Sequence, residues 1–77
     1  MQVEVIYFGM LAEITGCTSE QLVISNPDIS GLKDALLDKY PDFKNTDFRI
    51  AQNKELVLDA TLLTGQEIAV LPPFAGG

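Results

Sequence analysis

The sequence predicts one α+β domain in which a mixed sheet packs against a single main helix. One stretch repeats apolar residues with the 3.6-residue period of a helix, and several shorter stretches are β-branched or alternate as strands do. With 77 residues there is room for one core, and a hydrophobic content of 47% is enough to fill it. We therefore expect residues 1–77 to form a single domain that ends in a tail at 72–77.

The first strand is predicted over residues 2–8, a β-branched and aromatic run. Ile6 and Phe8 make its second face apolar as well, so we expect both faces to be covered toward the end of the strand and the strand to lie centrally in the sheet. Gly9 ends the strand. Good helix formers at 10–14 then predict a short helix of one or two turns.

A second strand is predicted over residues 20–25, and the main helix follows it. Asp28 is a suitable N-cap, and Pro41 ends the helix because the residue before a proline avoids the α region. Gly31 is expected to weaken the first turn slightly. The apolar stripe of this helix consists of Ile29, Leu32, Ala35, Leu36 and Tyr40.

Three more strands are predicted after a polar stretch at 42–47. They cover residues 48–51, 55–58 and 67–71, with turns at 53–54 and 65–66. The last strand is apolar throughout, so we expect it to be central and to lie beside the first strand. That arrangement is the ubiquitin-like β-grasp fold, and the periodicity agrees with it.

Composition limits the partners of the chain. A net charge of −6 opposes binding to nucleic acid and to anionic membranes. It favours partner proteins with basic docking faces, although the charge could instead serve solubility alone. No apolar run approaches the roughly 20 residues that span a bilayer, and no basic leader precedes an apolar stretch. The single cysteine, Cys17, cannot form an internal disulfide. We expect a cytoplasmic protein.

No active site is visible in the residue types. The chain has no histidine, which removes the commonest general base and metal ligand at neutral pH. Cys17 has no second thiol with which to hold zinc and no visible base to activate it. Asp34 and Asp38 share a helix face, where carboxylates are usually just solvated. We expect no catalytic residue, no metal and no bound cofactor.

The tail carries the one reactive group that stands out. Pro72 and Pro73 project the chain away from the body, and Gly76 and Gly77 follow with no side chains, so the end can enter a narrow channel. An inert, frayed terminus is the default interpretation of such a segment. The alternative is that the Gly77 carboxylate is activated as an acyl-adenylate and then attacked by sulfur.

Several segments resemble one known family. The runs GQEI at 65–68 and LPPFAGG at 71–77, together with YFGMLAE at 7–13 and Asn53, resemble the small subunit of molybdopterin synthase, within the MoaD/ThiS-like ubiquitin-like family. The likeness spans nearly the whole chain. Its departures are Gln66, Leu71 and Ala12, where the family usually has Asp, Phe and Arg. Because none of these lies in the tail, the expected role of the tail is unaffected.

The resemblance implies a sulfur carrier. In that family an E1-like enzyme uses ATP to adenylate the terminal glycine, here Gly77, and a sulfur donor protein converts it to a thiocarboxylate. The tail, which includes Phe74, Ala75 and Gly76, then enters the large subunit of molybdopterin synthase. There the sulfur passes to precursor Z and forms the molybdopterin dithiolene. Catalysis belongs to the large subunit, in an expected heterotetramer.

The resemblance also implies a docking surface and leaves rivals. Phe8, Leu56 and Leu71 match apolar positions that the family uses against partners, although each could instead be packed in the core. Phe74 could anchor the base of the tail. The competing functions are a sulfur carrier for thiazole (thiamine) synthesis, a ubiquitin-like protein modifier and a non-catalytic interaction module.

Overall fold

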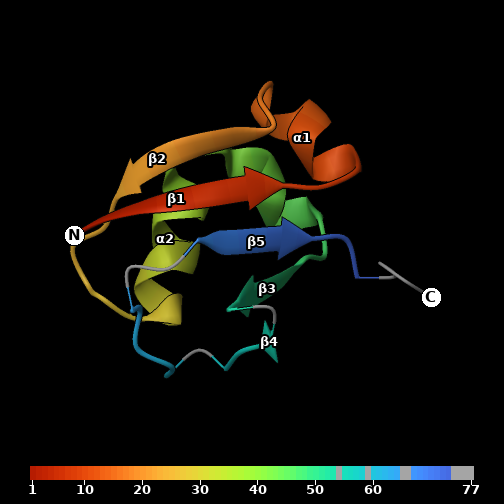
Figure 1. Cartoon of the computed structure of the whole chain (residues 1–77). Helices are drawn as coiled ribbons and strands as arrows, with labels where there is room; N and C mark the ends of the chain where they lie inside the picture. The colour runs from red at the N-terminus through yellow and green to blue at the C-terminus, as the bar shows by residue number, and fades with distance from the viewer. Residues whose placement is uncertain (54, 59, 65–66, 74–77) are drawn as a thin grey trace.

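The structure is a computed structural model, and it describes residues 1–53, 55–58, 60–64 and 67–73. Within these residues, five strands form one mixed sheet and helix α2 covers one of its faces (Figure 1). In chain order the elements are β1 (Gln2–Tyr7), α1 (Met10–Thr15), β2 (Ser19–Val23), α2 (Ile29–Lys39), the 3₁₀ helix η1 (Pro41–Asn45), β3 (Arg49–Gln52), β4 (Glu55–Leu56) and β5 (Ile68–Leu71).

The strand order across the sheet is β2-β1-β5-β3-β4. β1 pairs with β5 in parallel, with Val5 opposite Ile68 and Tyr7 opposite Val70. The prediction that the first and last strands lie side by side in the centre of a mixed sheet is therefore confirmed. Because these two strands run in parallel, they end at the same edge of the domain, and the chain leaves β5 next to the end of β1.

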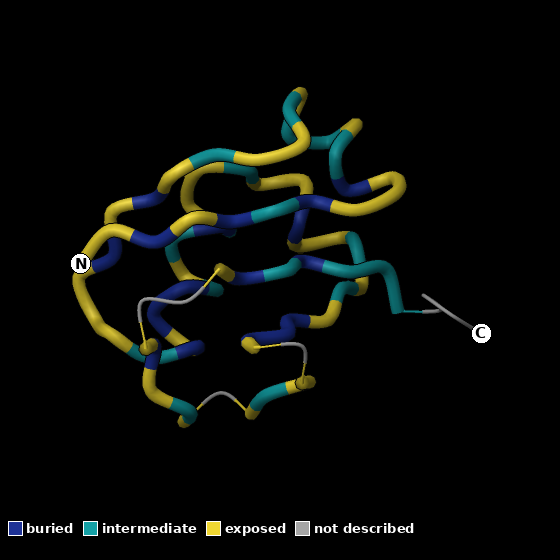
Figure 2. The backbone as a smooth tube through the Cα atoms, in the orientation of Figure 1, coloured by how far each residue is buried: buried dark blue, intermediate teal, exposed yellow. Residues whose placement is uncertain are grey.

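The core lies between the sheet and α2 (Figure 2). Side chains from alternate positions of the strands meet the apolar stripe of the helix. The buried residues are Val3, Val5, Tyr7, Leu11, Leu22, Ile24, Ile29, Leu32, Leu36, Phe43, Ile50, Leu63, Ile68 and Val70. The helix starts as predicted, because the Asp28 carboxylate accepts a 2.7 Å hydrogen bond from the Gly31 amide.

The structure differs in detail from the sequence prediction. No element was predicted in the polar stretch at 42–47, but η1 covers most of it and buries Phe43. At Gly31 the structure adds a packing reason for glycine that the sequence did not show, because a Cβ there would stand 2.3 Å from the backbone oxygen of Asn26. The strands predicted at 20–25 and 55–58 are shorter than expected. The expected turn residues 54 and 65–66 lie outside the described residues.

The expectation that both faces of β1 are covered toward its end was wrong. The central position is right, but Phe8 is 45% exposed and Ile6 is only half-buried. α2 covers the face that carries Val3 and Val5, and in the described part of the chain no helix packs over the other face (Figure 1). The sheet thus has an inner face, packed on α2, and an open face.

Candidate functional site

The start of the tail lies beside the open face, where the central strands β1 and β5 end. The amide of Phe8 donates a 3.1 Å hydrogen bond to the Val70 carbonyl, which continues the pairing of β1 and β5 beyond the strands themselves. α1 begins directly after this point, and its fully buried Leu11 fixes it to the core. The chain therefore leaves β5 against a well-anchored turn.

Gly9 lies under the first residue of the tail. Its φ of +59° is in the region that favours glycine, and a Cβ built on it would be 3.1 Å from Cγ of Pro72. The ring of Pro72 therefore packs where a side chain at Gly9 would be. Since the proline also fixes its own φ, the direction of the chain is set at this contact.

The three predicted docking residues all lie on the open face. Register places Ala69 of β5 between Ile6 of β1 and Ala51 of β3, and Ala51 is opposite Leu56 of β4. This row crosses four strands. Two residues further toward the tail on the same face, Leu71 of β5 is opposite Arg49 of β3, and Phe8 follows the last residue of β1. We call this surface the apolar patch; it consists of Ile6, Phe8, Ala51, Leu56, Ala69 and Leu71.

Exposure varies within the apolar patch. Leu56 is 67% exposed and Phe8 45%, whereas Ala51 is only 8% exposed. The remaining members, Ile6, Ala69 and Leu71, are half-buried. Away from the tail, the same face of β1 carries the exposed residues Gln2 and Glu4. The open face is therefore polar at one end and mostly apolar at the end from which the tail leaves, where the exposed Arg49 lies beside Leu71.

The tail itself is described only to Pro73. The predicted site residues Phe74, Ala75, Gly76 and Gly77 lie outside the described residues. Pro72 and Pro73 are half-buried, so the start of the tail rests on the body of the domain.

Sequence reasoning missed a polar cluster at the edge of the core. The carboxylate of Glu20 accepts hydrogen bonds from the hydroxyls of Tyr7 (2.6 Å) and Tyr40, and it pairs with the ammonium group of Lys39. Burial favours the neutral carboxyl, but the hydrogen bonds from Lys39, Tyr40 and Tyr7 outweigh it and lower the pKa of Glu20. Burial and the neighbouring carboxylate raise the pKa of Tyr7 and of Tyr40 above the ordinary range. No spacing of these residues in the chain indicated that they would meet.

Residues of the types that bind metals are scattered over the described part of the chain. No three His, Cys, Asp or Glu residues there lie close enough together to hold a metal ion. Cys17 is a free, half-buried thiol whose sulfur is 3.7 Å from the Thr15 hydroxyl. The longest described helix is α2, with 11 residues, and no described helix has the length and apolar content to cross a membrane.

These features define a ubiquitin-like β-grasp domain with an apolar patch beside its last strand. Solved structures show the same fold. A putative molybdopterin converting factor subunit 1 from Pyrococcus furiosus has a TM-score of 0.84 at 24% identity, over 95% of this chain and 98% of that one. SAMP1 from Haloferax volcanii has a TM-score of 0.80 at 21% identity over the whole of both chains. Small archaeal modifier protein 1 from Methanosarcina acetivorans has a TM-score of 0.78 at 26% identity, over 99% of this chain and 96% of that one.

Sequence comparison identifies the family. The profile of the ThiS family matches residues 5–77. The molybdopterin synthase sulfur carrier subunit of Homo sapiens is 36% identical over 84 aligned residues, which cover 99% of this chain and 94% of the human one. This chain belongs to the ThiS family, and the MoaD/ThiS-like resemblance seen in its segments is confirmed.

Proposed function

We propose that this chain is the sulfur carrier subunit of a molybdopterin synthase. The observation that carries the proposal is the 36% identity to the human subunit of that name across 99% of the chain. The geometry supports it, because the tail begins at an anchored turn and an apolar patch lies beside it. The described residues hold no metal-type cluster of their own.

In this proposal the Gly77 carboxylate is the group that reacts. An E1-like activating enzyme joins a carboxylate oxygen to the α-phosphorus of ATP and releases pyrophosphate. Sulfur at the oxidation level of sulfide, supplied by a sulfur donor protein, then attacks the acyl carbon and expels AMP, which leaves a thiocarboxylate. ATP is bound by the activating enzyme, so this chain needs no cofactor. Glycine suits the position because it has no side chain to obstruct either step.

The loaded tail delivers its sulfur to the large subunit. Residues Phe74, Ala75 and Gly76 thread the channel, and the sulfur of the thiocarboxylate bonds to a carbon of precursor Z. That carbon loses an oxygen substituent, which is protonated as it leaves. Water then cleaves the resulting thioester and restores the Gly77 carboxylate. Repetition builds the dithiolene of molybdopterin. The catalytic groups belong to the large subunit, in a cytoplasmic heterotetramer of the two kinds of chain.

The apolar patch is proposed as the surface that docks on the large subunit. Leu56 offers a matched test, because Leu62 is equally exposed at 67% and lies outside the patch. Leu56→Ser should weaken binding to the large subunit at least tenfold, since buried apolar anchors dominate interfaces, whereas Leu62→Ser should leave the affinity unchanged. Isothermal titration of the purified subunits measures both. Equal losses in the two variants would contradict a docking role for the patch.

The reaction of Gly77 is tested on the tail itself. Deleting Gly77, or appending one residue after it, should abolish sulfur transfer and leave thermal unfolding unchanged, because the reacting carboxylate is removed or displaced. The readout is molybdopterin formation with purified large subunit and activating enzyme. Molybdopterin formation by the extended chain would refute the carrier role.

A ubiquitin-like modifier is the second candidate, because two of the solved relatives are small archaeal modifier proteins with TM-scores of 0.80 and 0.78. Mass spectrometry of the chain purified from its native cell separates the possibilities. A thiocarboxylate shifts the mass by the difference between sulfur and oxygen, whereas a modifier yields isopeptide conjugates to lysines. Supplying the loaded chain to molybdopterin and thiazole synthesis in parallel then distinguishes the two kinds of carrier.

A further inference from the structure

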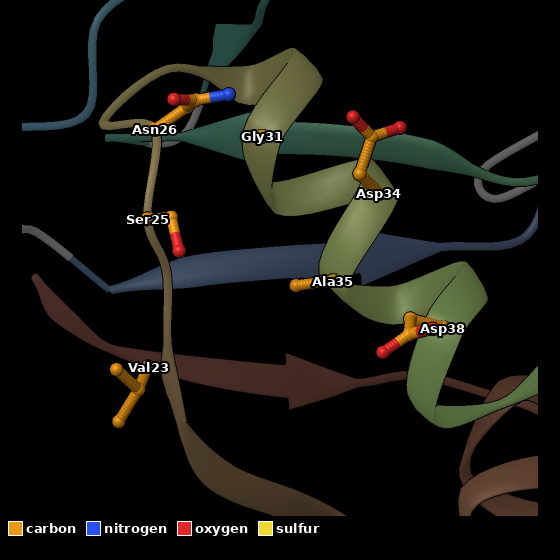
Figure 3. A pocket seen from close by; sticks show the side chains of 7 residues that line it. All are labelled: Val23, Ser25, Asn26, Gly31, Asp34, Ala35 and Asp38. Atoms are coloured by element: carbon orange, nitrogen blue, oxygen red, sulfur yellow. The ribbon is translucent and has the colours of Figure 1, made fainter.

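A groove lies between the edge strand β2 and helix α2 (Figure 3). Its volume is about 400 Å³, and Ala35 and Asp38 point from the helix toward the strand. The remaining lining residues are Val23, Ser25, Asn26, Gly31 and Asp34. Register separates the groove from the tail: Val23 is opposite Gln2, at the start of β1, whereas the tail leaves at the end of β1.

The strand beside the groove has one unused edge. β2 is the terminal strand of the sheet and pairs only with β1 among the described strands. Met1 and Ile24 exchange two hydrogen bonds, and the Tyr7 amide donates to the Thr18 carbonyl. Because antiparallel bonding alternates, the N–H and C=O groups of Gln21 and Val23 between these points are directed away from β1. They form a free edge onto which another strand can add.

The groove is also acidic. Asp34 and Asp38 lie one helical turn apart and are both exposed, and none of the described residues that line the groove is Lys or Arg. In the described part of the chain neither carboxylate has a salt bridge or hydrogen-bond partner. Val23, on the strand, is 77% exposed. The free edge is therefore flanked by an exposed apolar side chain and by two unpaired negative charges.

We propose that this groove binds an extended peptide segment of a partner protein that carries basic side chains at alternate positions. The segment adds to β2 through the backbone groups of Gln21 and Val23. Its side chains alternate between the two sides of the new strand. On one side Lys or Arg reaches Asp34 and Asp38, while on the other an apolar residue covers Val23.

Charge argues for a partner rather than a second copy of the chain. In a β2–β2 dimer the inserted segment would be Ser19–Val23, which contains Glu20 and no basic residue. Both protomers would also bring a net charge of −6 to the contact. Like charges placed together in this way oppose association, whereas a basic segment is attracted. Because the groove and the tail are at opposite ends of β1, a partner held here leaves the tail free to react.

The test uses the full chain and a synthetic peptide, acetyl-Val-Lys-Val-Lys-Val-Lys-Val-amide, followed by two-dimensional amide NMR. Binding should shift the amides of Gln21, Val23 and residues 31–38 and leave those of the apolar patch in place. The same peptide with Glu in place of Lys should not bind. Shifts confined to the apolar patch, equal binding of the Glu peptide, or no shifts at all would overturn the proposal.

Variants of the chain distinguish the contribution of the two carboxylates from that of the free strand edge. Asp34→Asn with Asp38→Asn should raise the Kd about fivefold, because two exposed ion pairs are lost. The matched control, Asp42→Asn with Asp47→Asn, removes two exposed carboxylates elsewhere and should leave the Kd unchanged. Val23→Pro removes a donor from the free edge without breaking a bond to β1, and it should weaken binding more than tenfold. If neither groove variant changes the Kd, or if β2 amides shift with concentration of the chain alone, the groove is not a peptide site.

Discussion

Leu36 and Leu56 are the same residue type on opposite sides of one sheet. Leu36 projects from α2 into the inner face and is fully buried, whereas Leu56 lies on the open face and is 67% exposed. The chain supplies apolar side chains to both faces but a covering helix to only one. An apolar residue therefore stabilises the fold when another element of the same chain packs over it. On the open face it is available to something outside the chain.

The largest expected effect comes from making the same change on the two faces. Leu36→Ala should lower the free energy of unfolding by about 3 kcal/mol, because it removes buried methyl groups and leaves a cavity. Leu56→Ala should change it by less than about 0.5 kcal/mol, as exposed substitutions usually do. Urea unfolding followed by circular dichroism measures both. A loss at Leu56 as large as that at Leu36 would mean that the open face is covered within the chain.

The second effect concerns the point where the tail begins. Gly9→Ala should destabilise the protein by about 2 kcal/mol, because the residue has a positive φ and its new Cβ would press on Pro72. Gly16 is a matched control: its φ is +79°, but a Cβ there meets nothing within 4 Å, so Gly16→Ala should show only the backbone penalty of about 1 kcal/mol.

NMR locates the disturbance in these glycine variants. The amides of Ala69 and Leu71 should shift in Gly9→Ala and not in Gly16→Ala, because of these two glycines only Gly9 lies against the described start of the tail. Equal stability losses with no shift in β5 would show that Pro72 is free to move, and that the contact with Gly9 does not direct the tail.

The sequence predicts the inner face well because two periodic signals agree there. The helix stripe and the alternation in β1 each mark residues that the structure buries, and Asp28 caps α2 as its residue type predicts. The open face could not be predicted in this way. Ile6 and Phe8 are apolar in either environment, and covering them depends on a second layer that local pattern does not reveal. Phe8, Leu56 and Leu71 were singled out only by family resemblance.

The long-range polar contacts could not be predicted from the sequence either. Glu20 meets Tyr40 across 20 positions and Tyr7 across 13, and no local rule relates such distant residues. The groove between β2 and α2 also arises only when the strand and the helix pack. Asp34 and Asp38 were correctly expected to face solvent, but the free strand edge beside them is a property of the assembled sheet.

The smallest expected effect tests the polar edge of the inner face. Glu20→Gln should lower the free energy of unfolding by roughly 1–2 kcal/mol at neutral pH, because a neutral amide replaces the charged acceptor that two tyrosine hydroxyls and Lys39 share. The folded state lowers the pKa of Glu20 below its ordinary value of 4.5. A lowered pKa means that ionised Glu20 stabilises the fold above that ordinary value, and that this contribution is lost as the pH falls through the folded pKa. The stability difference between the natural chain and Glu20→Gln should therefore be constant above about pH 6 and shrink below about pH 4.5. Urea unfolding at a series of pH values measures the difference, in which the titration of the other carboxylates cancels. A difference that grows on acidification would mean that Glu20 is held neutral in the fold, and that the inner face excludes charge even at its edge.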